Sequence, residues 1–291
     1  MTRSWPDGAA AATQRPDFTR DTAVTAVGEG TYAATCSTRW AAPMGPNGGY
    51  LAAIVLRAML AELDDPGRVP RSLTLHYLRP PVDGEVRVTV AVERTGRSLS
   101  TLTARLEQDG RLCIVAVGAF GMAFPTAADF ATAPPEAPPW RSVQPWPLDE
   151  AMPPISQQMH LRPAIGADPF SGAAEAVSGG WVSLREPAPV DAVLLALLVD
   201  AWLPSVFPVL TTPVGAPTID LTIHFRNPDA TALHPPDEPL LAVFRSTTSA
   251  DGYFEEDGGI WTPSGVLLAN SRQLALLRPM PDAPPAAPAA R

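Results

Sequence analysis

The segment LTLHY at residues 73–77 returns in the second half of the chain as LTIHF at residues 221–225. Both segments alternate apolar and polar residues, which is typical of a strand with one buried face. Similarity between two segments so far apart indicates that one structural unit is written twice. We therefore interpret each half of the chain against the other.

A long helix is predicted before the first repeated segment. Its apolar residues recur at three- and four-residue spacing: Leu51, Ile54, Val55, Ala58 and Met59. The segment NGG at 47–49 begins this helix, and DDPG at 64–67 ends it. Strand-like runs surround it at 21–27, 31–38, 72–78, 86–92, 99–106 and 112–120.

The second half repeats this order. We expect a strand at 181–184, a helix over 190–203, and strands at 219–225, 240–244 and 266–277. The predicted fold class is α+β: two fused repeats, each a long helix wrapped by a curved antiparallel sheet, the arrangement called a double hotdog. The predicted units are a first repeat at 1–124, a Pro/Ala-rich linker at 125–154, a second repeat at 155–280 and a disordered tail at 281–291.

Composition excludes several classes of protein. The chain has 291 residues, a formal net charge of −9 and no block of basic residues, so we expect no nucleic-acid partner. No run reaches the roughly 18 apolar residues of a membrane span. Residues 1–12 lack the apolar core of a signal peptide. We therefore expect a cytoplasmic protein without a membrane partner.

Residues that bind metals or act as nucleophiles lack their usual motifs here. The four histidines show no ligand spacing: His76, His160, His224 and His234. We predict that Cys36 and Cys113 are buried reduced thiols, and one disulfide between them stays open as an alternative. Neither a Gly-x-Ser-x-Gly elbow nor a phosphate-binding glycine loop occurs. The sequence therefore predicts no metal and no cofactor.

Three further segments stand out: GPNGGY at 45–50, PTIDL and HFR within 217–226, and GVLLANSRQ at 265–273. Together they resemble the acyl-CoA thioesterase II type of the hotdog thioesterase superfamily, over roughly residues 31–124 and 178–277. The resemblance implies an enzyme of fatty acid metabolism that hydrolyses acyl-CoA thioesters without a cofactor. It also implies a homo-oligomer, a dimer or larger, assembled through sheet edges.

In that family an Asp on a helix, a Thr on a strand and a Gln on a late strand hold the attacking water. The matching positions in this sequence are Asp200, Thr218 and Gln273, which form our candidate catalytic set. The amide of Gln273 can orient a water without titrating. A solvated strand position is the alternative interpretation of Gln273.

The surroundings of Asp200 suit a general base. It lies at the edge of the apolar stripe of the predicted second helix, and Pro204 places it in the last turn. Burial and the negative end of the helix dipole both raise a carboxylate pKa, which favours proton uptake near neutral pH. The alternative is a structural role, either a pair with an arginine or a cap on a neighbouring loop.

Thr218 poses a problem of direction. A regular pleat places it on the polar face of its strand, opposite Leu221 and away from the helix. Either the strand begins after Thr218, or the family correspondence fails at this position. The sequence leaves both open.

The start of the first helix is the candidate oxyanion and substrate-binding site: Asn47, Gly48, Gly49 and Tyr50. Glycines there let a substrate carbonyl approach backbone N–H groups. The second helix starts at 187–190 with PAPV and has no paired glycines, so we expect the first repeat to supply the oxyanion donors and the second the base. Close packing of helix and sheet is the alternative role for the glycines.

Two other functions compete with hydrolysis. A duplicated fold of this kind can bind an acyl group without turnover. A hotdog hydratase or dehydratase would need an acid and base pair such as Asp and His on one helix, and neither predicted helix contains a histidine.

Overall fold

The computed structural model describes residues 17–125, 127–128, 130–149 and 152–279. Its first half contains α1 (Asp17–Asp21), β1 (Thr25–Gly28), β2 (Thr31–Cys36), β3 (Ala41–Ala42), β4 (Gly45–Pro46), α2 (Gly48–Leu63), β5 (Val69–Tyr77), β6 (Gly84–Thr95), β7 (Leu99–Gln108) and β8 (Arg111–Gly121). Its second half contains β9 (Met159–Gly166), β10 (Val177–Leu184), α3 (Ala192–Leu198), β11 (Val214–Gly215), β12 (Thr218–Phe225), α4 (Pro228–Leu233), β13 (Leu240–Arg245), β14 (Ser249–Ala250), β15 (Tyr253–Trp261), β16 (Leu267–Leu276) and β17 (Arg278–Pro279). Short 3₁₀ turns lie at Thr38–Trp40, Trp140–Ser142, Pro154–Gln158 and Phe207–Val209.

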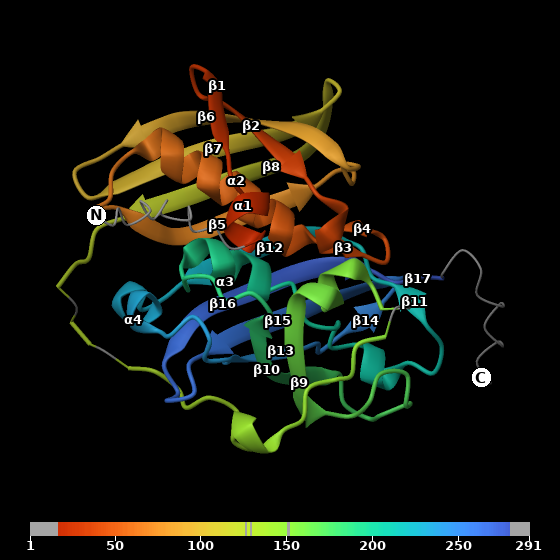
Figure 1. Cartoon of the computed structure of the whole chain (residues 1–291). Helices are drawn as coiled ribbons and strands as arrows, with labels where there is room; N and C mark the ends of the chain where they lie inside the picture. The colour runs from red at the N-terminus through yellow and green to blue at the C-terminus, as the bar shows by residue number, and fades with distance from the viewer. Residues whose placement is uncertain (1–16, 126, 129, 150–151, 280–291) are drawn as a thin grey trace, which may run out of the picture.

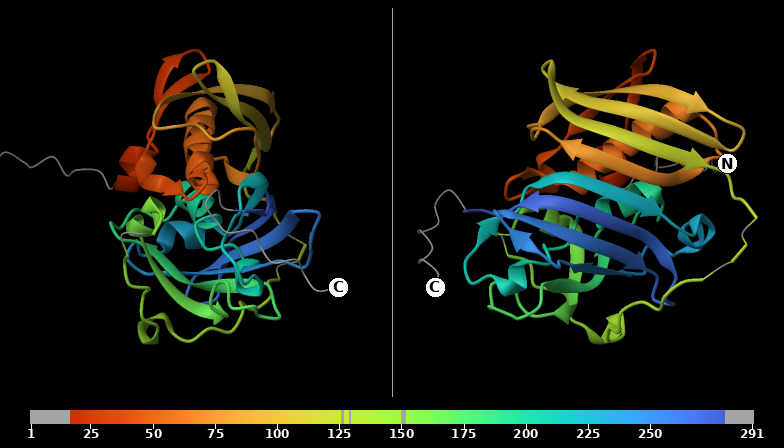
Figure 2. Two further views of the ribbon diagram at one scale, coloured as in Figure 1. Left: turned by 90° about the vertical axis from the view of Figure 1, so that its right-hand side faces the viewer. Right: turned by 180° about the vertical axis from the view of Figure 1, so that it is seen from behind.

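One antiparallel sheet of thirteen strands runs through the described residues. Its strand order is β1-β2-β6-β7-β8-β5-β12-β16-β15-β13-β10-β9, with β14 paired to β15. Seen from behind, the strands of both halves form one continuous face (Figure 2). Counted outward from the centre, β5, β8, β7, β6, β2 and β1 mirror β12, β16, β15, β13, β10 and β9. The two halves therefore share one topology.

The repeated segments are the two strands that join the halves. LTLHY lies in β5 and LTIHF in β12, and these strands pair antiparallel at the centre of the sheet. Thr74 pairs with Thr222 in this register, and their hydroxyl oxygens lie 3.1 Å apart. Buried Leu75 and Leu221 also face each other. The duplication is thus built around an approximate two-fold axis between β5 and β12.

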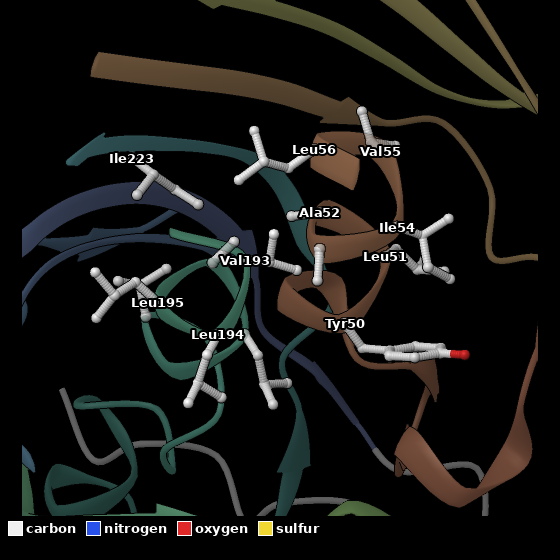
Figure 3. Close-up of a cluster of buried hydrophobic side chains, with 14 of the residues drawn as sticks. Tyr50, Leu51, Ala52, Ile54, Val55, Leu56, Val193, Leu194, Leu195 and Ile223 are labelled. Carbon is white, nitrogen blue, oxygen red and sulfur yellow. The ribbon is translucent and has the colours of Figure 1, made fainter. Parts of the chain in front are cut away.

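The helices α2 and α3 pack against each other inside this curved sheet (Figure 1). Ten residues of α2 are buried on all sides of the helix, because β6 and β7 cover one face and α3 meets another. Figure 3 shows Val193 of α3 facing Ala52 of α2 across their contact. The core of the two halves is therefore continuous, which fixes the ends of the two helices relative to each other.

The second helix is shorter than the sequence predicted. It begins at Ala192 rather than at 190, because Asp191 is its N-cap and accepts the N–H of Leu194 at 2.8 Å. It ends at Leu198 rather than at 203, where the N–H of Asp200 turns to the carbonyl of Leu197 at 3.1 Å. Asp200 therefore lies just beyond the helix, and the predicted start at 187–190 is wrong.

Several other elements differ from the prediction. Residues 17–21 form α1, so the first strand begins at Thr25 rather than at 21. The strands β9 and β15 were not predicted; in β15 the residues EED at 255–257 and two glycines hide the alternation. The first helix and the remaining main strands overlap the predicted ranges, although β10 begins at Val177 rather than at 181.

The segment predicted as a linker packs onto the second half. Trp146 stacks on Trp202 with ring centroids 5.9 Å apart, and Trp181 donates its indole N–H to the carbonyl of Pro138 at 2.9 Å. The unit boundaries and the homo-oligomer stay predictions, and the tail at 281–291 lies outside the described residues. Cys36 and Cys113 are buried free thiols, as predicted. No helix in the described part of the chain is long and apolar enough to span a membrane.

Candidate active site

The N-terminus of α2 meets the turn that follows α3. Asn47 caps α2, since its side-chain oxygen accepts the N–H of Tyr50 at 2.9 Å. Its amide nitrogen donates to both the carbonyl oxygen and Oδ2 of Asp200, at 2.7 and 3.0 Å. The N–H of Gly49 also donates to Oδ2 of Asp200, at 2.9 Å. The first half of the chain thus holds a carboxylate that the second half supplies.

Burial raises the pKa of Asp200 from 3.8 to about 7. The backbone N–H of Gly49 acts against burial, and so do Gly48 and Asn47, because donors at a helix N-terminus favour the charged carboxylate. The negative charge of Glu256 acts in the same direction as burial. The sequence predicted a raised pKa from burial and an adverse helix end, and the structure adds a favourable helix end that limits the shift.

The paired glycines allow the close contact between α2 and α3. A Cβ atom on Gly49 would lie 2.6 Å from the carbonyl oxygen of Leu197 and 2.7 Å from that of Ala196. A Cβ on Gly48 would lie 2.9 Å from Oδ2 of Asp200. Close packing, the alternative role for these glycines, is therefore part of their function. The N–H of Gly49, which the sequence offered to an oxyanion, donates to Asp200 here.

The side chain of Tyr50 points away from α3 (Figure 3). The carbonyl oxygens of Asp21 and Thr35 lie 2.8 and 3.0 Å from the Tyr50 hydroxyl oxygen, and both are placed to accept its proton. The same hydroxyl oxygen accepts the N–H of Ser37 at 3.1 Å. The ring of Tyr50 stacks on Trp40. Tyr50 is fully buried, so it anchors α2 to the first strands.

Thr218 and Gln273 lie together in a second cluster. The hydroxyl of Thr218 donates to Oε1 of Gln273 at 2.9 Å, and Nε2 of Gln273 donates to Oε1 of Glu256 at 2.7 Å. The backbone N–H of Ser205 donates to Oε2 of the same glutamate. Gln273 is 7% exposed, so the solvated position considered for it is wrong.

A β-bulge brings Thr218 to the inner face of the sheet. Thr218 pairs with Ala275, yet Asp220 pairs with Leu274, so the register shifts between Thr218 and Asp220. The extra residue reverses the alternation, and Thr218 then shares the buried face of Gln273 and Leu221. The strand β12 begins at Thr218, so a strand start after Thr218 is wrong, and the irregular pleat accounts for the direction of the side chain. The family correspondence at Thr218 stays a prediction.

Tyr77 lies where the two clusters approach each other. It ends β5 next to the start of β12, and its hydroxyl donates to the carbonyl of Gly48 at 2.8 Å. Burial raises the pKa of Tyr77, and the charge of Asp200 raises it further. No hydrogen bond among the described residues joins Asp200 to Thr218 or Gln273. The described residues also contain no group of three His, Cys, Asp or Glu side chains arranged to hold a metal.

Tyr77→Phe is expected to lower the free energy of unfolding by about 1 kcal/mol, because the carbonyl of Gly48 loses a buried donor. The ring itself fits, since the second repeat carries Phe225 at the matching position. Urea unfolding measures the change, with Tyr253→Phe as a control on an exposed tyrosine. Equal stability of both variants and the wild type would contradict a contribution from this hydrogen bond.

The glutamate Glu256 and the tyrosine Tyr77 were not singled out by the sequence. Glu256 is 4% exposed and lies between buried Phe254 and Gly258 on the inner face of β15. Recognition of that strand would have revealed a carboxylate on an apolar face. For Tyr77 the only signal was its position at the end of the repeated segment.

Two protein-family models match the chain. The acyl-CoA thioesterase N-terminal domain matches residues 37–121, and the acyl-CoA thioesterase C-terminal domain matches residues 129–277. No functionally curated protein shows significant similarity to the chain.

Solved structures show the same fold. A hot dog fold protein of unknown function from Alicyclobacillus acidocaldarius is 28% identical, with a TM-score of 0.83 over 90% of this chain and 97% of that one. A proposed thioesterase II from Thermobifida fusca is 27% identical, with a TM-score of 0.78 over 90% and 98%. An acyl-CoA thioesterase II from Mycobacterium marinum is 21% identical, with a TM-score of 0.72 over 91% and 100%, and supports the fold alone.

The described chain therefore has a hotdog fold. The C-terminal domain profile alone spans more than half of the 291 residues, and the N-terminal profile accounts for most of the first half. This protein belongs to the acyl-CoA thioesterase family and is a thioesterase.

Proposed function

We propose that this double-hotdog protein hydrolyses acyl-CoA thioesters to a free acid and CoA, with Asp200 as the general base. The observation that carries the proposal is the environment of this carboxylate. It is enclosed between two helix ends, with a pKa of about 7, so it is ready to exchange a proton near neutral pH. The double hotdog is supported by the mirrored strand order of the two halves.

The two carboxylate oxygens of Asp200 have different surroundings. Oδ2 accepts from Asn47 and Gly49, whereas Oδ1 accepts no hydrogen bond from the described residues. We assign Oδ1 to the attacking water. Asp200 takes a proton from this water while the oxygen of the water bonds to the thioester carbon. The carbon–sulfur bond then breaks, and the proton on Asp200 passes to the leaving thiolate.

Thr218 and Gln273 are assigned to positioning the water, and the start of α2 to the oxyanion. Negative charge moves during the reaction from Asp200 to the carbonyl oxygen of the substrate. The N-terminus of α2 carries partial positive charge that favours an anion at either place. As Asp200 becomes protonated it accepts more weakly from Gly49, which leaves this N–H to the oxyanion. No cofactor takes part in these steps.

Turnover is expected to rise with pH through a midpoint of about 7, because Asp200 acts as a base only when ionised and its pKa is raised to about 7. A profile of kcat/KM from pH 5 to 9 measures this midpoint. Substrate stability without protein at each pH provides the control. A profile that is already flat from pH 5 upward, as for an aspartate with its ordinary pKa of 3.8, would contradict the assignment of Asp200.

Release of free thiol from short, medium and long acyl-CoAs tests the function itself. We expect hydrolysis of at least one chain-length class by the wild type, and the panel then identifies the preferred class. Binding of the same acyl-CoAs is measured in parallel by calorimetry. Tight binding without thiol release from any of them would instead favour an acyl-binding protein.

A further inference from the structure

Glu256 is a buried carboxylate without a basic partner among the described residues. It is 4% exposed, and both of its oxygens accept from N–H groups: Oε1 from the side chain of Gln273 and Oε2 from the backbone of Ser205. Burial raises the pKa of Glu256, and these donors act in the opposite direction. A charge in this position costs folding free energy, so it calls for an explanation other than stability.

The first half of the chain reaches the same fold without this carboxylate. The repeated segments make Leu73 the counterpart of Leu221; in the sheet Leu73 pairs with Gly118 and Leu221 pairs with Gln273. One strand further out, Gly118 pairs with Leu102, and Gln273 pairs with Glu256. The pair Glu256 and Gln273 thus stands where the first half has leucine and glycine. The sheet itself does not require it.

The ionised glutamate determines which end of the Gln273 amide faces Thr218. A carboxylate only accepts, so the NH₂ group of Gln273 must point to Glu256 and its carbonyl oxygen to Thr218. Thr218 has a single hydroxyl proton, which it donates to that carbonyl. The lone pairs of the Thr218 oxygen then remain to accept a proton from a water.

We propose that Glu256 is a positioning residue that fixes the Gln273 amide and thereby holds the Thr218 hydroxyl oxygen as an acceptor for the attacking water. The inference deepens the proposed function and rests on it for its catalytic part. Water that donates one proton to Thr218 and the other to Asp200 directs its lone pair at the thioester carbon. Glu256 touches neither water nor substrate in this arrangement.

Glu256→Gln tests the proposal because it keeps the shape and removes the charge. The side chain of a glutamine has one accepting oxygen and one donating NH₂ group, so at 256 it cannot accept from both Ser205 and Gln273. The Gln273 amide then loses its acceptor or turns over. We expect kcat to fall roughly 10- to 100-fold, with KM changed less than about 3-fold. Glu255→Gln is the matched control, since Glu255 lies on the other face of β15 and binds Thr247 and Thr248. It should keep wild-type kcat.

The pH profile separates positioning from a merely structural role. The negative charge of Glu256 on β15 raises the pKa of Asp200, whereas the neighbouring Tyr77 on β5 has its own pKa raised by burial and by the charge of Asp200. Removal of the negative charge at 256 should move the midpoint of the kcat/KM profile to lower pH, while Glu255→Gln leaves it in place. A folded Glu256→Gln variant with wild-type kcat and midpoint would overturn the proposal.

A measurement without substrate distinguishes this inference from the proposed function. In ¹⁵N-glutamine-labelled wild type at pH 8, we expect one Gln273 amide proton shifted downfield by its bond to a carboxylate, and loss of this shift in Glu256→Gln. Absence of thiol release together with this shift would reject the proposed function and keep the amide orientation. A Gln273 signal typical of a solvated side chain in the wild type would reject the orientation, even if Glu256→Gln failed to fold.

Discussion

Asp200→Asn is expected to lower kcat for thioester hydrolysis by about 10²- to 10⁴-fold, the usual contribution of a general base. Asparagine keeps the shape of the side chain and an oxygen that can accept from Gly49 and Asn47, but it cannot take up a proton. Thiol release at pH 8 measures the change. Asp220→Asn is a matched control on the outer face of β12 and should retain wild-type kcat.

The stability of Asp200→Asn shows whether such a loss is chemical. The pKa of Asp200 rises from 3.8 unfolded to about 7 folded, so the unfolded chain gives up this proton first. The ionised carboxylate therefore lowers the free energy of unfolding. This effect is absent below pH 3.8, grows as the pH rises, and reaches up to roughly 4 kcal/mol above pH 7. Asparagine carries no charge, so at pH 8 the variant should be at least as stable as the wild type. A variant that unfolds more readily at pH 8 would mean that the inactivity reflects lost structure.

Gly49→Ala is expected to lower the free energy of unfolding by about 3 kcal/mol, at the upper end of the usual cost of overpacking. The added methyl group would lie 2.6 and 2.7 Å from two carbonyl oxygens of α3 and 3.0 Å from Cβ of Asp200. Because backbone atoms form the obstacle, α2 and α3 must move apart. We also expect hydrolysis to fall at least about 10-fold, since the movement displaces Asp200 from the N-terminus of α2.

Gly28→Ala provides the control for this substitution. Its added methyl would have Thr31 as nearest neighbour at 3.8 Å, an ordinary contact. Urea unfolding and thiol release should both remain close to wild type in this variant. Wild-type stability in Gly49→Ala would show that the two helices can separate without cost.

The repeated segments and the spacing of apolar residues in α2 predicted the central strands and the first helix, because period-two alternation and helical spacing are local properties. The end of α3 was not predictable in the same way. Pro204 sets only an outer limit, while the observed end at Leu198 accompanies contacts of Asp200 with Asn47 and Gly49. These residues are about 150 positions apart in the chain, and no local pattern encodes their meeting.

The remaining errors also concern interactions between distant strands. The face of Thr218 depends on one extra residue in β12 relative to β16, whereas the sequence argument assumed a regular pleat. The proposed role of Glu256 depends on its contact with Gln273, its partner in the register of β15 and β16. A charged residue between two other acids, Glu255 and Asp257, gave no sign of burial. Sequence therefore identified the chemical groups better than it identified their partners.

Both copies of the unit lie in a single polypeptide, and the pairing of β5 with β12 joins them in one sheet. In a symmetric pair of separate identical chains, every substitution enters twice, so a change that benefits one centre is imposed on the other. Fusion removes this constraint. Here the first copy has leucine and glycine where the second has Glu256 and Gln273, so the two halves have been free to diverge. We would accordingly count one reaction centre for each pair of units.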